Sequence, residues 1–281
     1  VLIFVDSIGN FIEIRPEFIE ANSIKDFYPS KNLNNGFRVY IEALGTLNET
    51  QLYKLIYKIG KQIKVDKLSE RIDIALPIMH GPYAEDGSIQ GLLEWYGIPY
   101  VGPSVLGSAI GINKPFQNHL LSKSNGQKKK TRVISRKEWE NANKSSLFSE
   151  LTKTLGFPLV VKAPHQGSSI GVGIVRKRSM EEFSKKMLQC FFDAVIYQKE
   201  WSKLTARQKK NVLEKMQALD EGIGFPVVLN GEEVSHPSKL QKALDLYLKT
   251  NTEVTLSSNN AEDYVLIEEF IEGQEFSMGL I

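Results

Sequence analysis

The sequence predicts an α/β protein with two regions in which strands and helices alternate. Three observations indicate this class: amphipathic segments with a helical period, short apolar runs of strand length, and glycine or proline residues between them. Because alternating strands and helices favour a mainly parallel sheet, we expect a Rossmann-like α/β domain over residues 1–112.

The first region shows these patterns most clearly in two segments. In residues 51–63, leucine and isoleucine recur one helical turn apart, whereas residues 72–79 form a mostly apolar run of strand length. The elements expected here are strands over 1–5 and 11–15, a helix over 51–63, a strand over 72–79, a helix over 88–96 and a short strand over 100–102.

The second region begins near Asn113. Its expected elements are helices over 114–122 and 137–155 and strands over 131–135, 157–162, 173–176 and 264–270. Residues 178–263 fit this pattern poorly, so we interpret them as an inserted module of unassigned role. The predicted domains are therefore 1–112, then 113–177 together with 264–281, and the insertion. Both ends fall within apolar strand patterns, which predicts that the chain is part of a longer protein.

Composition excludes several classes of function. Lys and Arg number 35 and Asp and Glu 33, and this balance does not favour a nucleic-acid or membrane-surface binder. The single cysteine, Cys190, excludes an internal disulfide framework and suits the cytoplasm. No apolar run approaches the roughly 20 residues that a membrane-spanning helix needs. Three adjacent lysines, 128–130, are interpreted as a solvated loop.

The strongest local signal is a lysine followed by a loop rich in glycine and serine. Lys162 ends an apolar strand, and the run Gly167, Ser168 and Ser169 begins five residues later. Glycine lets backbone N–H groups approach an anion, serine adds donors, and lysine adds positive charge. The pattern indicates a nucleotide-phosphate site, although a hairpin with a surface lysine would look the same. It is not a Walker A loop, because the lysine precedes the glycines.

Two further features agree with a nucleotide site. Glu268 and Glu269 lie at the end of an apolar strand and Glu275 lies at the start of the next one. The carboxylates of Glu268 and Glu275 could therefore contact adenine and ribose. Lys114 offers a second ammonium group at the start of a predicted helix. Taken alone, these features are better explained by a solvated acidic hairpin and a surface lysine.

Together with residues 80–91, these motifs resemble the ATP-grasp superfamily and, within it, the D-alanine–D-alanine ligase family. The specific block reads His-Gly-Pro-Tyr-Ala-Glu-Asp-Gly-Ser-Ile-Gln-Gly, and Gly-Ile-Pro-Tyr-Val-Gly follows at 97–102. The order of the blocks is that of the family. The resemblance covers residues 72–177 and 264–281 well and 1–71 loosely. It implies an ATP-grasp subdomain after the N-terminal domain, with the C-terminal ATP-grasp part truncated.

The resemblance also implies an activity. The protein would use ATP and Mg²⁺ to join two molecules of D-alanine through an acyl phosphate, for peptidoglycan precursors in the cytoplasm, and would form a homodimer. Metal ligands, a catalytic Arg and a lid Tyr are expected beyond residue 281. The implied site residues are Lys114 and Lys162 at the phosphates, Gly167, Ser168 and Ser169 in the closing loop, Glu268, Glu269 and Ile271 near adenine, Glu275 at the ribose, and His80 with Ser168 as catalytic residues beside the first D-alanine.

Some positions depart from the family, and several functions stay open. Ala84, Ala163 and Asn113 stand where the family more often has Gly, Pro and Asp. Glu85 and Asp86 are expected to stabilise the start of the next helix. The alternatives are a D-alanine–D-lactate or D-alanine–D-serine ligase, another ATP-grasp carboxylate–amine ligase, and a nucleotide-binding module without catalysis.

Overall fold

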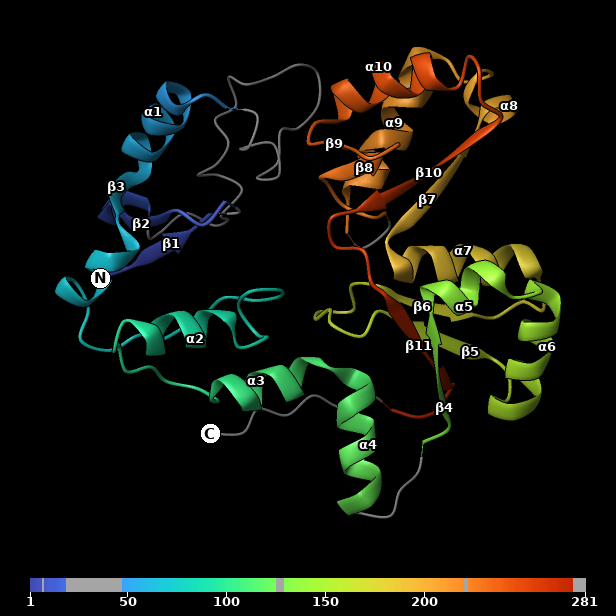
Figure 1. Ribbon diagram of the computed structural model, residues 1–281, viewed down its shortest axis with the longest axis horizontal. Helices are drawn as coiled ribbons and strands as arrows, with labels where there is room; N and C mark the ends of the chain where they lie inside the picture. The colour runs from blue at the N-terminus through green and yellow to red at the C-terminus, as the bar shows by residue number, and fades with distance from the viewer. Residues whose placement is uncertain (7, 19–46, 125–128, 220–221, 275–281) are drawn as a thin grey trace. The chain divides into compact units, whose positions relative to one another are not determined.

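The computed structural model describes residues 1–6, 8–18, 47–124, 129–219 and 222–274 (Figure 1). Their fold is mixed α/β, as the sequence predicts, and their strands form three sheets. The chain divides into two compact units, one of residues 1–111 with 192–261 and the other of 112–191 with 262–281. Within the described part of the chain, no helix has both the length and the apolar character needed to cross a membrane.

The first unit begins with a sheet of order β1-β2-β3, formed by Ile3–Val5, Phe11–Ile14 and Gly60–Ile63. Both pairings are antiparallel, so the prediction of a mainly parallel sheet in this region is wrong. The reason is the short turn between β1 and β2, since parallel neighbours need a long crossover connection. The one parallel contact among the described residues is an isolated bridge between Ala75 and Tyr100, and no longer strand forms over 72–79.

Helix α1 (Glu49–Ile59) packs its apolar face on this sheet. It begins at Asn48 with a capping box and ends four residues earlier than its apolar periodicity predicts, because the chain enters β3 at Gly60. A Cβ at Gly60 would lie 2.1 Å from the carbonyl oxygen of Glu13, so only glycine fits beside β2. A second apolar cluster joins this sheet to helix α2. The other helical elements of this part are η1 (Pro16–Phe18), η5 (Val65–Glu70), α2 (Ser88–Trp95) and α3 (Val105–Ile112).

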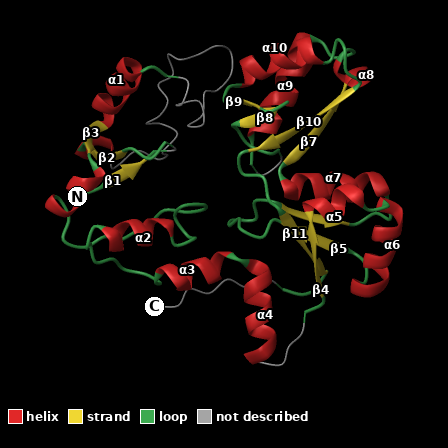
Figure 2. Cartoon of the chain, viewed as in Figure 1, coloured by secondary structure: helices red, strands yellow, loops and turns green. Residues whose placement is uncertain are grey.

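Residues 192–261 form a second sheet with helices beside it (Figure 2). The strand order is β7-β10-β8-β9 and every pairing is antiparallel. Asp245 accepts hydrogen bonds from Trp201 Nε1 at 2.8 Å and Lys209 Nζ at 2.6 Å, which ties the helices together. The elements are β7 (Asp193–Tyr197), α8 (Gln198–Trp201), α9 (Ala206–Gln217), β8 (Val227–Leu229), β9 (Glu232–Val234), α10 (Pro237–Tyr247) and β10 (Glu253–Ser258).

The second unit contains an antiparallel sheet of order β4-β11-β5-β6. One face packs against helices α5, α6 and α7, where aromatic and aliphatic side chains form a buried core (Figure 1). Helix α7 lies within residues 178–263, which we predict as an insertion; the division into domains stays a prediction. The elements are α4 (Lys114–Ser124), β4 (Thr131–Ser135), α5 (Arg136–Asn141), α6 (Lys144–Leu155), β5 (Leu159–Lys162), β6 (Val172–Val175), α7 (Met180–Phe191) and β11 (Tyr264–Glu269).

Candidate functional site

The candidate site lies on the face of this sheet opposite the buried core. Alternate residues of a strand point to opposite faces. Val161 on β5 and Ile267 on β11 face the core, so Lys162 and Glu268 face away from it. Lys162 Nζ lies 2.7 Å from Glu268 Oε2, across two neighbouring strands. The sequence-predicted cation and one of the predicted acids therefore form an ion pair.

Two more side chains complete the surroundings of Glu268. Lys129 Nζ lies 2.6 Å from the same oxygen, Oε2, and Asn118 Nδ2 on α4 donates to Oε1 at 3.0 Å. The sequence analysis missed Lys129, because three adjacent lysines are typical of a solvated loop. Its side chain is only 30% exposed. Because β4 pairs with β11 so that Thr131 lies opposite Glu268, the residues just before β4, including Lys129, come close to Glu268.

The charges in this cluster do not cancel. Glu268 is 2% exposed. Burial acts to raise the pKa of its carboxyl group, but hydrogen bonds and positive charge from Lys129 and Lys162 outweigh burial and hold that pKa below its ordinary value. The carboxylate is thus ionised at neutral pH. One negative charge against two ammonium groups leaves the cluster cationic, which suits a phosphate.

The glycine- and serine-rich loop connects β5 to β6 directly beside Lys162. The Ala163 N–H donates to the Gly171 carbonyl at 2.7 Å and closes the base of the loop. At its tip Ser168 and Ser169 are exposed and have φ values of 50° and 62°. Non-glycine residues adopt positive φ at a cost, and such strain is found at ligand sites more often than elsewhere.

Lys114, the second predicted cation, contacts this loop from the start of α4. Its backbone N–H donates to the Pro164 carbonyl at 3.3 Å, and its Nζ donates to the carbonyls of Pro164 and Gln166. The structure therefore brings Lys114 and Lys162 to the same loop, although they are far apart in the sequence.

The residues predicted near adenine and ribose are less completely described. Glu269 Oε1 accepts the Lys130 N–H at 2.8 Å, beside the end of β11. Ile271, just past β11, is 66% exposed. Glu275 lies outside the described residues. The contacts of these side chains with a nucleotide stay predictions.

His80 belongs to the first unit, in the loop before α2. Its side chain is 83% exposed, and Nδ1 lies 3.8 Å from Glu85 Oε1. Glu85 also accepts the Gly81 N–H at 2.7 Å, and Asp86 accepts the N–H groups of Tyr83 and Ser88. Burial acts to raise the pKa of Asp86, but these backbone donors outweigh it and lower that pKa. Asp86 thus contacts the first residue of α2, as expected, whereas the contacts of Glu85 lie within the loop.

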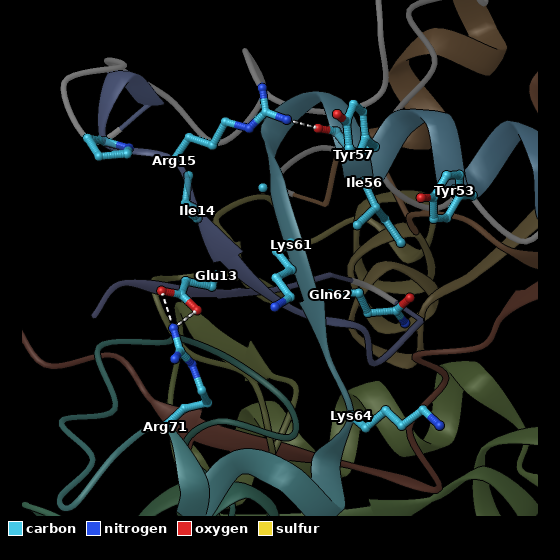
Figure 3. Close-up of a pocket in the computed structure, with 12 residues that line it drawn as sticks. Glu13, Ile14, Arg15, Tyr53, Ile56, Tyr57, Lys61, Gln62, Lys64 and Arg71 are labelled. Atoms are coloured by element: carbon cyan, nitrogen blue, oxygen red, sulfur yellow. Dashed lines mark hydrogen bonds and ion pairs between the residues drawn. The ribbon is translucent and has the colours of Figure 1, made fainter.

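A pocket in the first unit lies between β2, α1 and β3 and contains none of the predicted site residues (Figure 3). Arg71 reaches Glu13 at 2.6 Å across it, and Arg15 donates to the Tyr57 carbonyl at 2.7 Å. These bonds engage Glu13, Arg15 and Arg71, and Lys61 and Lys64 also line the pocket.

The second unit thus has the parts expected of an ATP-grasp type of α/β protein: a sheet with helices on one face, a lysine on the open face, and a glycine- and serine-rich loop beside that lysine. Two family models match the chain: the D-ala D-ala ligase N-terminus over residues 2–103 and the D-ala D-ala ligase C-terminus over residues 121–196. Together they match more than half of the chain. The chain belongs to the D-alanine–D-alanine ligase family.

Individual relatives agree with this family. A D-alanine–D-alanine ligase of Bacillus velezensis is 40% identical over 114 residues, which are 41% of this chain and 31% of the relative. One of Heliobacterium modesticaldum is 36% identical over 177 residues, 63% of this chain and 43% of the relative. The chain thus spans less than half the length of these relatives. The solved D-alanine-D-alanine ligase from Coxiella burnetii aligns with a TM-score of 0.48 and 18% identity, over 96% of this chain and 53% of that one; a score of this size establishes no common fold by itself.

Proposed function

We propose that the protein is an ATP-dependent D-alanine–D-alanine ligase that makes the dipeptide for peptidoglycan precursors. The observation that carries this proposal is the cationic cluster of Lys129, Lys162 and Glu268 beside a glycine- and serine-rich loop, in a chain of this ligase family. We further propose that it acts in the cytoplasm as a homodimer.

The proposed reaction has two steps. A carboxylate oxygen of the first D-alanine attacks the γ-phosphorus of ATP. The bond between that phosphorus and the oxygen shared with the β-phosphate breaks, so that ADP departs and the D-alanine is left as an acyl phosphate. The amine of the second D-alanine then attacks the acyl carbon, loses a proton and expels inorganic phosphate. Positive charge on the transferred phosphoryl group lowers the barrier of the first step.

The residues of this chain supply charge and exclude water in this scheme. Lys114 and Lys162 are proposed to bind the phosphates, and the loop of Gly167, Ser168 and Ser169 to close over them. Closure matters because an acyl phosphate reacts with water. Two exposed serines at the tip of a loop anchored at its base support this role, since such a tip can move while its ends stay in place.

The remaining site residues are proposed from the family resemblance. Ser168 and His80 would act beside the first D-alanine. Glu268, Glu269 and Ile271 would line the adenine site, with Glu275 at the ribose. The exposure of Ile271 past the end of β11 supports its contact with an adenine ring.

Mg²⁺ is proposed to accompany ATP. The described part of the chain offers no cluster of His, Cys, Asp and Glu side chains that could hold a metal ion, so no step is assigned to the metal here. The charge that these residues supply is that of the lysine ammonium groups.

The test is an assay of phosphate release by the full-length protein with ATP and D-alanine. We expect release that depends on D-alanine, with D-alanyl-D-alanine as the product in mass spectrometry. A mixed product when D-lactate or D-serine is added would identify the related ligases instead. ATP binding without release in any combination would favour a nucleotide-binding module without catalysis.

A further inference from the structure

We propose that His165, fixed by the buried carboxylate of Glu262, is a positioning residue that sets the geometry of the phosphate loop; this inference rests on the proposed nucleotide function. His165 lies inside the loop, two residues before Gly167, and neither it nor Glu262 is among the residues that the sequence singles out.

Glu262 holds His165 with both carboxylate oxygens. Oε1 accepts the backbone N–H of His165 at 3.2 Å, and Oε2 lies 2.8 Å from Nδ1 of the imidazole ring. Glu262 is 6% exposed, and its own carbonyl accepts a hydrogen bond from Arg136 at 2.9 Å. A buried acid that fixes both the backbone and the ring of one residue determines its conformation.

Two polar side chains face the other side of the ring. Tyr264 OH lies 3.1 Å and Asn113 Nδ2 lies 3.2 Å from Nε2 of His165. The amide of Asn113 has a defined orientation, because its Oδ1 accepts the Phe116 N–H at 3.0 Å as the cap of α4. Its NH₂ group therefore points at His165.

The groups around Nε2 also contact one another. Asn113 Nδ2 donates to Tyr264 OH at 3.1 Å, so the amide, the phenol and the ring form one polar cluster. The ring is therefore a connector between this cluster and the carboxylate of Glu262. An acid at position 113 would present an acceptor where the amide presents its donor.

The connector joins three elements of the second unit. Asn113 caps α4, and His165 lies in the loop. Tyr264 is the first residue of β11, and Glu262 lies two residues before it. The carbonyls on either side of His165, those of Pro164 and Gln166, are the ones that Lys114 binds. The orientation of His165 thus sets both the path of the loop toward Gly167 and the position of a proposed phosphate-binding lysine.

The experiment uses the full-length protein and three variants: His165→Ala, Glu262→Gln and Asn113→Asp. The last keeps the helix cap and replaces the donor that faces Nε2 by an acceptor. For each, calorimetry with a non-hydrolysable ATP analogue gives the dissociation constant, and steady-state assays give kcat and the KM values for ATP and D-alanine. His119→Ala, an exposed histidine on α4, and Asp263→Asn, an exposed acid beside Glu262, are the matched controls.

We expect the dissociation constant and the KM for ATP to rise about tenfold in His165→Ala, which equals the loss of a hydrogen bond to a charged group. Asn113→Asp and Glu262→Gln should raise the same two ATP constants. The KM for D-alanine in these variants, and all constants of the two control variants, should stay within about twofold of wild type. If His165→Ala fails to fold, as judged by thermal unfolding, the ATP constants of Asn113→Asp decide the test. ATP constants that stay within twofold of wild type would overturn the inference. Failure of the wild-type protein itself to bind the analogue would instead overturn the proposed function.

Discussion

Lys162 Nζ and Glu268 Oε2 lie 2.7 Å apart across strands β5 and β11, on the face of the sheet that the helical core leaves open. The pair is buried at its acidic end and partly exposed at its basic end, where the side chain of Lys162 is 26% exposed. Glu268 therefore keeps the lysine beside the phosphate loop without removing the positive charge of the cluster, because Lys129 adds a second ammonium group.

The first prediction concerns Lys162. Replacing it by alanine should lower ATP-dependent dipeptide formation about a hundredfold, the usual effect of losing one charged contact to a transition state. The measurement is kcat/KM from phosphate release. Lys177→Ala, an exposed lysine just past β6, serves as the control. Unchanged kcat/KM in Lys162→Ala would refute the role given to this residue.

Lys129 should contribute to ATP affinity although it lies in a run of lysines. Lys129→Ala removes one of two cations around Glu268 and should weaken ATP binding by roughly three- to tenfold, or about 1 kcal/mol. Lys130→Ala is the matched control, because its neighbouring side chain is exposed. The two variants are compared by calorimetry, and equal affinities would show that the run acts only as a solvated loop.

Ser168 should affect turnover more than binding. Its place at the exposed tip of the loop fits a contact that forms when the loop closes over the reacting groups. In Ser168→Ala we expect kcat to fall about tenfold, while the dissociation constant for ATP changes by less than about threefold. A parallel loss in both quantities would indicate collapse of the loop instead.

Glu268 should make stability depend on pH. Its pKa is below the ordinary value of 4.5, so its contribution to folding is present above that pH and is lost as pH falls through the lower pKa of the folded state. The free energy of unfolding of wild type minus that of Glu268→Gln should therefore be positive near pH 7 and shrink below pH 4.5. Glu272→Gln, an exposed acid, should show no such trend. A difference that is constant between pH 7 and pH 3 would contradict the assigned ionisation.

The sequence predicts elements well where local pattern and long-range pairing agree. The helix periodicity of residues 51–63 continues past Gly60, but pairing of the next residues with β2 ends the helix there. The single helix predicted over 137–155 is two helices, because Asn143 caps the second one through the Ser146 N–H. The periodicity of apolar residues does not reveal which strand a segment pairs with or which side chain caps a helix.

The candidate site shows the same limit. Lys162 and the loop after it are adjacent in the chain, so their proximity is readable from the sequence. Lys129 pairs with Glu268 and His165 with Glu262, in each case more than 90 residues away in the sequence. No local sequence pattern predicts these contacts. A family resemblance supplies the motif positions, whereas the contacts that hold these motifs come from the fold.

The most direct test of the central claim is calorimetric titration of Mg-ATP into the full-length protein. If two lysines and the glycine- and serine-rich loop bind the phosphates, the titration should give saturable heat with one site per chain, and Lys162→Ala should weaken it strongly. Absence of binding heat in the wild-type protein would contradict the account.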